Sequence, residues 1–565
     1  MDHRNTYFAV TLVLLEGCWS AGVDDDSGRS STDVQQSGGT VGATGGLDDL
    51  SDECTTDDRP ARCQPERLKA LSLSAGTLEP AFDPEIHSYS VQVDWLVGEL
   101  SIAYETSDSA EVSLQPYKPT ANDGSFAVPL NLDQNTISIE VRAANQEPVQ
   151  YHLNITRGTT SATVLGSEGS STTYFGQSVA LSGNVLAVGA RGDRTIAYGA
   201  GAVYLYERDA STGWHQVAVL HEPDPAGGQQ FGSSLALQGD TLAVGAESAD
   251  VGDSVNAGAV HIFVRSDNGT WNHSEVLTAP NVDASDAFGH SIALDGNTLA
   301  ISADRESSST RNLETDNNDL DEAGAVYIYT RSNAGWALSS YVKAPIPQLR
   351  GQFGYALAMA DGRLAVTAIG DNSPLQIDDD PNNYRLGPGS LYLFELQEDE
   401  SWTTSLHVQE YDSAVLFGTS VDLSSDTLVV GVSKQRAIAT DLHTQEGAVR
   451  VYQRSAQGDW ELQTELVAAE NSGAYSFGAD VALGTSSLLV GAIYASPSPS
   501  SNDEAPLPGP GAVYFFDRHS SGNWAASGYW ASPTDGTPWY GKGLALDGQT
   551  WVVGAAGDHE AVYAY

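Results

Sequence analysis

The chain has few basic residues and a large excess of acidic ones. Its 565 residues include 26 Lys and Arg against 74 Asp and Glu, which gives a formal net charge of −48. Phosphate backbones are bound by clustered Lys and Arg, so this shortage excludes nucleic acid as a partner. An acidic surface repels anionic membrane faces and keeps a protein soluble, and it also attracts divalent cations or a cationic partner.

Cysteine is scarce, with three residues in the whole chain. Cys54 and Cys63 lie in one short segment, where a local disulfide fits an exported protein. The alternative is a zinc site, but two cysteines alone supply too few ligands for one. The sequence therefore predicts a disulfide between Cys54 and Cys63, and leaves Cys18 at a different place.

Long hydrophobic runs are also missing. The N-terminal apolar run, residues 8–15, is far shorter than the roughly 20 residues that span a bilayer, and it fits a signal peptide over residues 1–18. The end of this segment, with Leu15, Gly17 and Cys18, resembles a bacterial lipobox, although Glu16 departs from that pattern. The resemblance implies that Cys18 is lipidated and anchors the protein in the bacterial cell envelope, at the outer membrane. The alternative is an ordinary signal peptide that is removed with Cys18 and leaves a secreted protein.

Catalytic signatures are absent from the sequence. It contains no Gly-x-Ser-x-Gly elbow and no His-Glu-x-x-His pair, and the twelve histidines are scattered. We expect none of these histidines to share a constellation with cysteine or paired carboxylates. The sequence therefore predicts that the protein is not an enzyme.

Composition changes along the chain mark two segments before the repeats. Residues 19–66 are rich in Ser, Gly, Thr and Asp and predict a disordered tether. In residues 67–157 apolar residues alternate with polar ones, as in Tyr89, Val91 and Val93. This period of two is typical of half-buried strands, so the segment predicts a small β-sandwich.

The remainder, residues 161–565, is a sevenfold repeat. Each copy has Phe-Gly or Tyr-Gly, then an apolar stretch like Leu-Ala-Val-Gly-Ala, then a form of Gly-Ala-Val-Tyr. The copies begin at Phe175, Phe231, Phe288, Phe353, Phe417, Phe477 and Tyr540. Each copy predicts four strands, and repeats of this length fit the blades of a β-propeller. The last copy lacks a fourth strand, which we expect residues 162–165 to supply from the other end, closing the ring.

These motifs resemble two known families. Phe231-Gly232 with Val244-Gly245-Ala246 and the equivalent copies resemble FG-GAP repeats, which form the seven-bladed propeller of integrin alpha chains and of many bacterial surface proteins. Residues 67–157, from Leu73 onwards, resemble the bacterial cadherin-like β-sandwich, which implies a spacer or adhesion module. Integrin repeats carry a calcium loop between their first and second strands. Here that turn has only two residues, as in Gly239-Asp240, which is too short to surround calcium.

Length variation between the repeats is confined to the second turns and the crossovers, which share one face of a propeller. Binding surfaces usually occupy such variable loops. The longest second turns span residues 304–323, 369–388 and 493–510, and two of them are strongly acidic. Their oxygen-rich positions are candidate calcium ligands, and the alternative is a solvated acidic loop. The candidates are Asn317, Asp319, Asp321, Asp378, Asp379 and Asp380.

The sequence thus predicts an all-β protein: a disordered N-terminal tether, a small β-sandwich and a seven-bladed β-propeller. We expect a monomeric, non-catalytic cell-surface protein that binds an extracellular protein or polysaccharide and contacts membrane only through a lipid anchor. No cofactor is certain, and calcium is the candidate. The alternative function is an extracellular propeller enzyme acting on glycans. Carboxylates converging at the mouth of the central channel would favour the enzyme, and a wide loop surface without them would favour the binder.

Overall fold

The computed structural model describes residues 65–565, with internal gaps. The residues it does not describe are 1–64, 96, 107–109, 117–123, 132, 145, 159–162, 167–172, 210, 314–316, 372–386, 412–414, 435–446, 469–475, 496–508, 534–538 and 558–559. The chain divides into the compact units Met1–Cys63 and Gln64–Tyr565, and all described residues belong to the second. Their regular structure consists of β-strands, and none of them forms a helix long and apolar enough to cross a membrane. The lipidation site Cys18, the cysteines Cys54 and Cys63, and nearly all of the predicted tether lie outside the described residues.

The first part of the described chain is a two-sheet sandwich. One sheet has three strands in the order β1-β4-β6, and the other has five in the order β2-β3-β8-β7-β5. Their bounds are β1 (Ala70–Leu73), β2 (Leu78–Glu79), β3 (Ser88–Val93), β4 (Glu99–Glu105), β5 (Ala110–Gln115), β6 (Ser125–Pro129), β7 (Asp133–Ala143) and β8 (Val149–Arg157).

Alternation of buried and exposed residues builds the core of this sandwich. In β3, Tyr89, Val91 and Val93 are buried while the residues between them are exposed. Strand β3 pairs in parallel with β8, whose alternate residues are buried as well. Side chains of successive strand residues point to opposite faces, so one face of each strand enters the core, as the sequence predicts.

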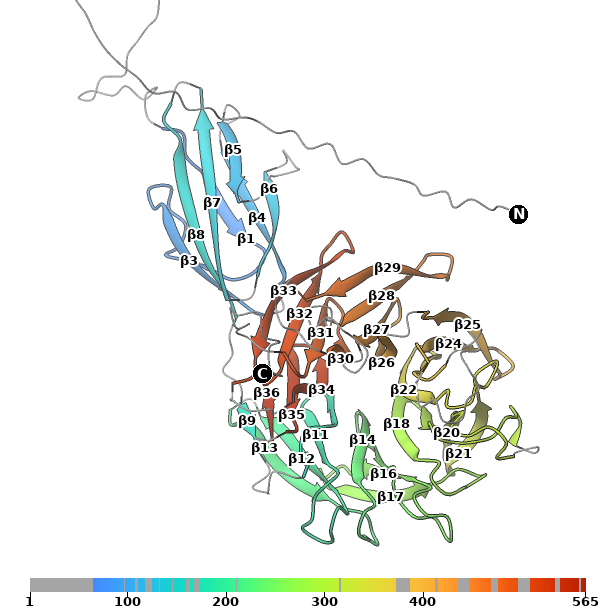
Figure 1. Cartoon of the computed structure of the whole chain (residues 1–565). Helices are drawn as coiled ribbons and strands as arrows, with labels where there is room; N and C mark the ends of the chain where they lie inside the picture. Colours follow the sequence, from blue (N-terminus) through green and yellow to red (C-terminus); the bar gives the residue numbers. More distant parts are fainter. Residues whose placement is uncertain are drawn as a thin grey trace, which may run out of the picture. The chain divides into compact units, whose positions relative to one another are not determined.

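Seven four-stranded sheets follow in the described residues, each an antiparallel meander of consecutive strands except the last (Figure 1). The first three contain β10 (Val179–Ser182), β11 (Val185–Ala190), β12 (Ala202–Asp209), β13 (Gly213–Leu220); β14 (Phe231–Gln238), β15 (Thr241–Ala246), β16 (Ala259–Arg265), β17 (Trp271–Leu277); and β18 (Phe288–Asp295), β19 (Thr298–Ala303), β20 (Ala325–Ser332), β21 (Gly335–Val342). The next three contain β22 (Phe353–Ala360), β23 (Arg363–Ala368), β24 (Ser390–Leu396), β25 (Trp402–Gln409); β26 (Val415–Leu423), β27 (Thr427–Lys434), β28 (Ala448–Arg454), β29 (Trp460–Val467); and β30 (Phe477–Leu483), β31 (Ser487–Ala492), β32 (Ala512–Arg518), β33 (Trp524–Ala531). The last contains β34 (Tyr540–Asp547), β35 (Thr550–Ala555), β36 (Ala561–Ala564) and β9 (Thr163–Leu165).

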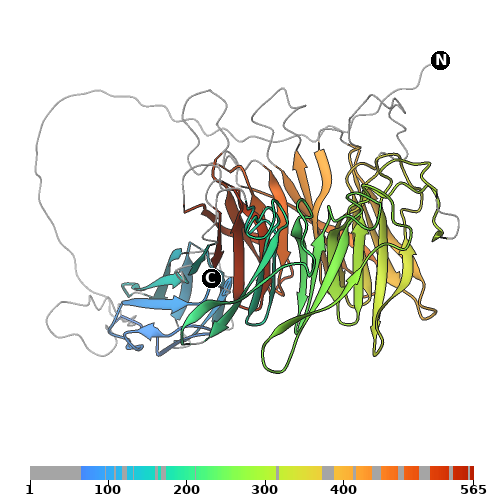
Figure 2. The same ribbon diagram turned by 90° about the horizontal axis from the view of Figure 1, so that it is seen from below.

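The first strands of the sheets form a closed inner ring. Each first strand contacts the first strand of the next sheet, from β10 through β14, β18, β22, β26 and β30 to β34. Strand β34 contacts β10 in turn, so the series closes. Figure 2 shows the ring strands side by side, running between two faces on which the turns lie.

The second strands are buried on both sides between neighbouring sheets. All six residues of β11, β15, β31 and β35 are buried. A continuous apolar run is expected where both faces of a strand are covered, as the sequence predicts. Five of the six tryptophans that follow the third turns are buried, as Trp271 is against the neighbouring sheet, and Trp402 is half-buried.

Glycine recurs where the backbones of neighbouring sheets meet. A Cβ added to Gly245 of β15 would lie 2.4 Å from the Gly289 oxygen of the next sheet and 2.2 Å from Ser234 Oγ. Gly289 has a φ of 92°, which residues with a side chain rarely adopt. The same close approach recurs at Gly189, Gly431, Gly491 and Gly554. The glycines of the repeat are therefore needed for contact between sheets.

The last sheet is completed by a strand from the N-terminal side. β9 pairs with β36 in antiparallel register, with Leu165 opposite Val562 and Thr163 opposite Ala564. Leu165 is 6% exposed and packs in the cluster between the last and first sheets, whereas Val164 is 61% exposed. The expected joining of the two ends of the ring is confirmed.

We expect Leu165→Asp to lower the free energy of unfolding by about 2–4 kcal/mol, because it places an unpaired charge in the closing contact. Val164→Asp is the matched control in the same strand, and its exposed side chain predicts a change within about 0.5 kcal/mol. Urea unfolding monitored by tryptophan fluorescence measures both. Equal midpoints for the two variants would show that β9 does not hold the ring closed.

Candidate functional site

The two faces of the ring differ in the length of their turns. In an antiparallel meander the first and third turns lie on one face, and the second turns and crossovers lie on the other. The first turns are short, as between β14 and β15, whereas the second turn between β19 and β20 runs from Asp304 to Gly324. We call the face with the second turns and crossovers the variable face, and the opposite one the short-turn face.

The sandwich contacts the short-turn face. Trp95 Nε1 donates a hydrogen bond of 3.0 Å to the Gln549 carbonyl in the first turn of the last sheet. The Trp95 ring also packs edge-on against Phe515 and Trp551. Arg157, at the end of β8, forms a buried ion pair of 2.5 Å with Asp517 near the end of β32.

Arg157 also joins the sandwich strands to this contact. Its Nε donates to the Trp95 carbonyl and its Nη1 to the Leu130 carbonyl. Gly98 lies so close that an added Cβ would be 2.6 Å from Asp517 Cγ. The sandwich therefore packs against the short-turn face and does not occupy the variable face.

The variable face carries exposed apolar side chains. Among the described residues, every exposed large hydrophobic residue that lies outside a strand is in a second turn or a crossover. They are Ile196, Tyr198, Val255, Ile346, Leu349 and Tyr411. Tyr198 is the most exposed, at 73%, and the Arg194 guanidinium lies 4.4 Å from its ring centroid. The described short turns of the opposite face carry no exposed large hydrophobic residue, so the two faces differ in this respect.

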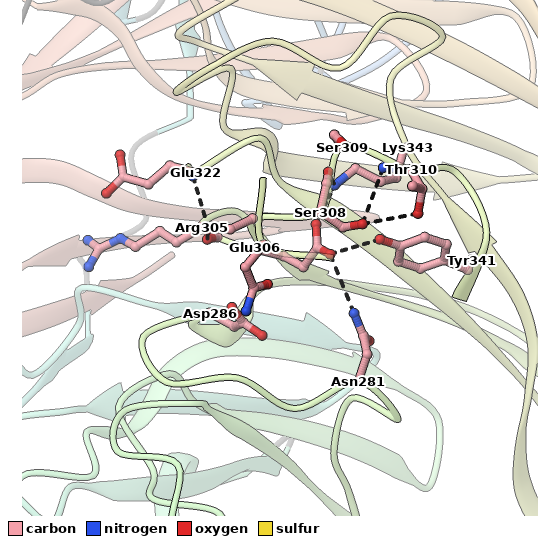
Figure 3. A network of polar contacts seen from close by, with 12 residues as sticks. Asn281, Asp286, Arg305, Glu306, Ser308, Ser309, Thr310, Glu322, Tyr341 and Lys343 are labelled. Carbon is pink, nitrogen blue, oxygen red and sulfur yellow. Dashed lines mark hydrogen bonds and ion pairs between the residues drawn. The ribbon is translucent and has the colours of Figure 1, made fainter. Parts of the chain in front are cut away.

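A buried ion pair fixes the long turn between β19 and β20 (Figure 3). Glu306 Oε2 accepts a bond from Lys343 Nζ, and the two side chains are 2% and 0% exposed. Glu306 Oε1 accepts a bond of 2.9 Å from the Tyr341 hydroxyl and one of 3.4 Å from Asn281 Nδ2. These partners come from β21 and from the crossover after β17, so the start of the turn is held by two sheets.

The rest of this turn is held by its own polar groups. Lys343 Nζ donates to the Ser308 carbonyl at 2.5 Å, and the Leu320 amide donates to the Ser307 carbonyl at 2.9 Å. Asn317 Oδ1 accepts bonds of 3.0 Å from both the amide and the hydroxyl of Ser309. The turn is therefore a braced projection of the variable face.

Two of the three candidate calcium ligands of this turn, Asn317 and Asp321, have protein partners. Asn317 Oδ1 faces Ser309, and Asp321 Oδ2 lies 3.5 Å from Arg350 Nε, while Asp319 is exposed. The second candidate set, Asp378, Asp379 and Asp380, lies outside the described residues. Within the described part of the chain, no group of three or more His, Cys, Asp or Glu residues could hold a metal ion. Calcium binding stays a prediction.

A second polar cluster joins the first three sheets at the variable-face ends of their strands. His290 Nδ1, near the start of β18, lies 3.0 Å from Glu247 Oε2 and 3.8 Å from Asp304 Oδ1. Arg191 Nη1, after β11, lies 3.7 Å from Glu247 Oε1. The Asp304 side chain is 2% exposed, and its Oδ1 has no hydrogen-bond partner. We call Arg191, Glu247, His290 and Asp304 the axial cluster.

The two carboxyl groups of the axial cluster, Glu247 and Asp304, have pKa values shifted in opposite directions because their surroundings differ. Burial raises the pKa of Asp304. Burial also acts to raise the pKa of Glu247, but the hydrogen bond from His290 and the nearby positive charges together outweigh it and lower that pKa. The carboxylates around His290 likewise outweigh its burial and raise its pKa. His290 therefore lies between two carboxyl groups of unequal acidity. The expectation that no histidine shares a constellation with paired carboxylates is therefore wrong.

Sequence spacing hides this cluster because its residues come from separate repeats. Glu247 and His290 are 43 positions apart, and only the packing of one sheet on the next brings them together. One signal was present: His290 follows Phe288-Gly289 directly, where the first and fourth repeats have Gln177 and Tyr355. The position after Phe-Gly varies between repeats, which distinguishes it from the structural positions around it.

Two half-buried carboxyl groups lie on neighbouring first strands. Asp422 Oδ2 accepts from the Leu483 amide and Asp480 Oδ2 from the Leu544 amide, at 2.7 and 2.8 Å. Burial raises the pKa of Asp422 to about 6 and that of Asp480 to about 7. Asp480 occupies the place where other repeats have Ser234 or Ser420, whose hydroxyls donate to the glycine carbonyl of the next sheet.

Comparison with known families agrees with this architecture. Residues 159–206, 214–263 and 271–329 match the FG-GAP repeat, and residues 68–158 match the cadherin-like beta sandwich domain. No curated protein matches the chain. The chain therefore has a β-propeller-like part with FG-GAP repeats, preceded by a cadherin-like β-sandwich. This domain content is that of an extracellular protein of the binding or adhesion type.

We expect Lys343→Met to destabilise the protein by about 3–5 kcal/mol, because it leaves the Glu306 carboxylate buried without its cation. Lys343→Met combined with Glu306→Gln removes both charges and should recover most of this loss, since the amide oxygen still accepts from Tyr341. Differential scanning calorimetry measures both variants. A double variant as unstable as the single one would contradict the ion-pair explanation.

The pKa of Asp480 predicts a pH-dependent stability difference. A carboxyl group whose pKa is raised by folding binds protons more tightly in the folded state, so its contribution falls as pH rises from about 4 towards 7. Asp480→Asn should therefore match the wild type near pH 4 and be more stable at pH 8, by up to about 1.4 kcal/mol per unit of pKa shift. Urea unfolding across this pH range, with the exposed Asp240→Asn as control, measures the difference. A difference that stays constant with pH would contradict the assignment.

Proposed function

We propose that the protein is a non-catalytic cell-surface binding protein whose seven sheets are the blades of an FG-GAP-type propeller. Its ligand is an extracellular protein or polysaccharide, and it binds on the variable face. The exposed apolar side chains in the variable loops of that face, opposite the sandwich, carry this proposal.

Two further features support the variable face as the binding surface. The Glu306–Lys343 pair braces the longest described turn, and a braced loop loses less conformational freedom on binding than a loose one. The sandwich contacts the short-turn face through Trp95 and Arg157. The variable face thus points away from the domain that links the ring to the N-terminal segment.

An array of glycans and extracellular matrix proteins, probed with and without calcium, tests this proposal. Tyr198→Ala combined with Ile346→Ala should weaken binding of any ligand found by at least about tenfold, because both side chains are exposed on the variable face. Tyr529→Ala is the control, since Tyr529 is 51% exposed but lies on the outer strand β33. Unchanged binding in the double variant, or no binding by the wild type, would contradict the proposal.

One observation favours the alternative, an extracellular propeller enzyme acting on glycans. In the axial cluster the carboxyl groups of Glu247 and Asp304 converge on His290, and their pKa values are shifted in opposite directions, as in acid–base pairs. The near-complete burial of Asp304 argues against substrate contact. Glycan hydrolysis by the wild type that is lost in Glu247→Gln would favour the enzyme.

We further propose that Cys18 is lipidated and anchors the protein in the bacterial envelope, with a disulfide between Cys54 and Cys63. Cys18→Ser should release the protein from membranes and abolish incorporation of labelled palmitate, because the thiol is the acceptor of the lipid. A wild-type protein that is secreted without lipid would exclude the anchor.

A further inference from the structure

A cavity of about 600 Å³ opens on the short-turn face, away from the proposed binding surface. The first turns of three consecutive sheets flank it, those between β26 and β27, β30 and β31, and β34 and β35. The side chain of Arg518, the last residue of β32, completes the lining. A volume of this size lies within the range of small-molecule sites.

The cavity lies where bonds between first turns are missing. In the first three sheets the turn glycine donates its amide to the preceding sheet: Gly183 to Asp547 Oδ2, Gly239 to Ser182 Oγ and Gly296 to Gln238 Oε1, at 2.6, 3.0 and 2.6 Å. Among the described residues, no such bond joins the three turns around the cavity to one another. A Cβ added to Gly548 would meet no atom within 4 Å, so this glycine faces open space.

The lining is rich in hydroxyl groups over a small apolar base. Ser425, Thr485 and Ser486 provide hydroxyls, and Gln549 provides an amide. The hydroxyl of Ser424, which also lines the cavity, is engaged within its own turn by Asp426 and Thr427. The apolar part consists of Leu483 and Leu546. Hydroxyls and amides both donate and accept hydrogen bonds, so this lining suits a ligand whose own groups do both.

The charges around the cavity restrict the ligand further. Arg518 is engaged by Asp426 Oδ2 at 3.1 Å and by Gln453 Oε1 at 2.6 Å, so its charge is compensated. Asp426 and Asp547 leave the lining with a net negative charge. Anionic ligands such as nucleotides are therefore disfavoured, and no aromatic ring lines the cavity to receive a large apolar ligand.

We propose that this cavity is a binding site for a neutral saccharide, of the size of a monosaccharide or the end of a longer glycan. The ring hydroxyls bind the serine, threonine and Gln549 side chains, and the apolar face of the sugar lies on Leu483 and Leu546. The site does not depend on the proposed function, because it uses the opposite face of the ring and different residues.

Saturation-transfer NMR with glucose, galactose, mannose, fucose and N-acetylglucosamine tests the site, with N-acetylneuraminic acid as an anionic probe. We expect saturable transfer to at least one neutral sugar and at least about tenfold weaker binding in Ser486→Trp, whose indole would fill the cavity. Asn184→Trp is the matched control: Asn184 holds the equivalent exposed turn position, and its carbonyl accepts the Arg208 amide as that of Ser486 accepts the Arg518 amide.

Binding that survives in Ser486→Trp would overturn the site, as would no saturable binding of any neutral sugar to the wild type. Preference for N-acetylneuraminic acid over the neutral sugars would overturn the charge argument. Tyr198→Ala with Ile346→Ala should leave this binding unchanged, so failure of the saccharide site and failure of the variable-face proposal give different results.

Discussion

The close approach of backbones between neighbouring sheets is the constraint on which the ring depends. At Gly245, as at the equivalent glycines, no side chain fits between one sheet and the Phe-Gly carbonyl of the next. Where the third and fourth sheets have Ser302 and Thr367 instead, the hydroxyls bond to the backbone of their own first strands, at Ser291 and Ala356. Two of the seven interfaces therefore accommodate a side chain, whereas at the five with glycine the backbones of neighbouring sheets meet directly and fix the spacing.

This fixed spacing separates the roles of the two faces. Short turns on one face receive the sandwich through Trp95 and the buried Arg157–Asp517 pair. The turns of the opposite face vary in length, and that face carries exposed apolar residues and the braced turn at Glu306. A rigid ring thus carries loops of variable length, which is the usual division between a scaffold and a binding surface.

The sequence predicts the features that recur in every repeat, but not the contacts between residues of different repeats. Strand positions, the buried second strands and the closing strand at Leu165 follow from periodicity, because seven copies of one pattern report the same local physics. The axial cluster could not be predicted, since Glu247 and His290 become neighbours only through the packing of different sheets. The cavity beside Arg518 was hidden for a similar reason, because it lies between the turns of three different sheets. The calcium candidates depended on loop composition alone, which does not report that Asn317 Oδ1 already accepts two bonds.

The spacing constraint is tested most directly by adding one methyl group at a sheet interface and following amide hydrogen exchange. In Gly245→Ala the new Cβ meets Ser234 Oγ and the Gly289 oxygen, whereas in Gly166→Ala, the control, it meets nothing within 4 Å. We expect Gly245→Ala to accelerate exchange in β15 and β18 and, because the ring is closed, in the remaining sheets as well. Exchange that matches the wild type, or that rises only within β15, would contradict a ring locked by contact between its backbones.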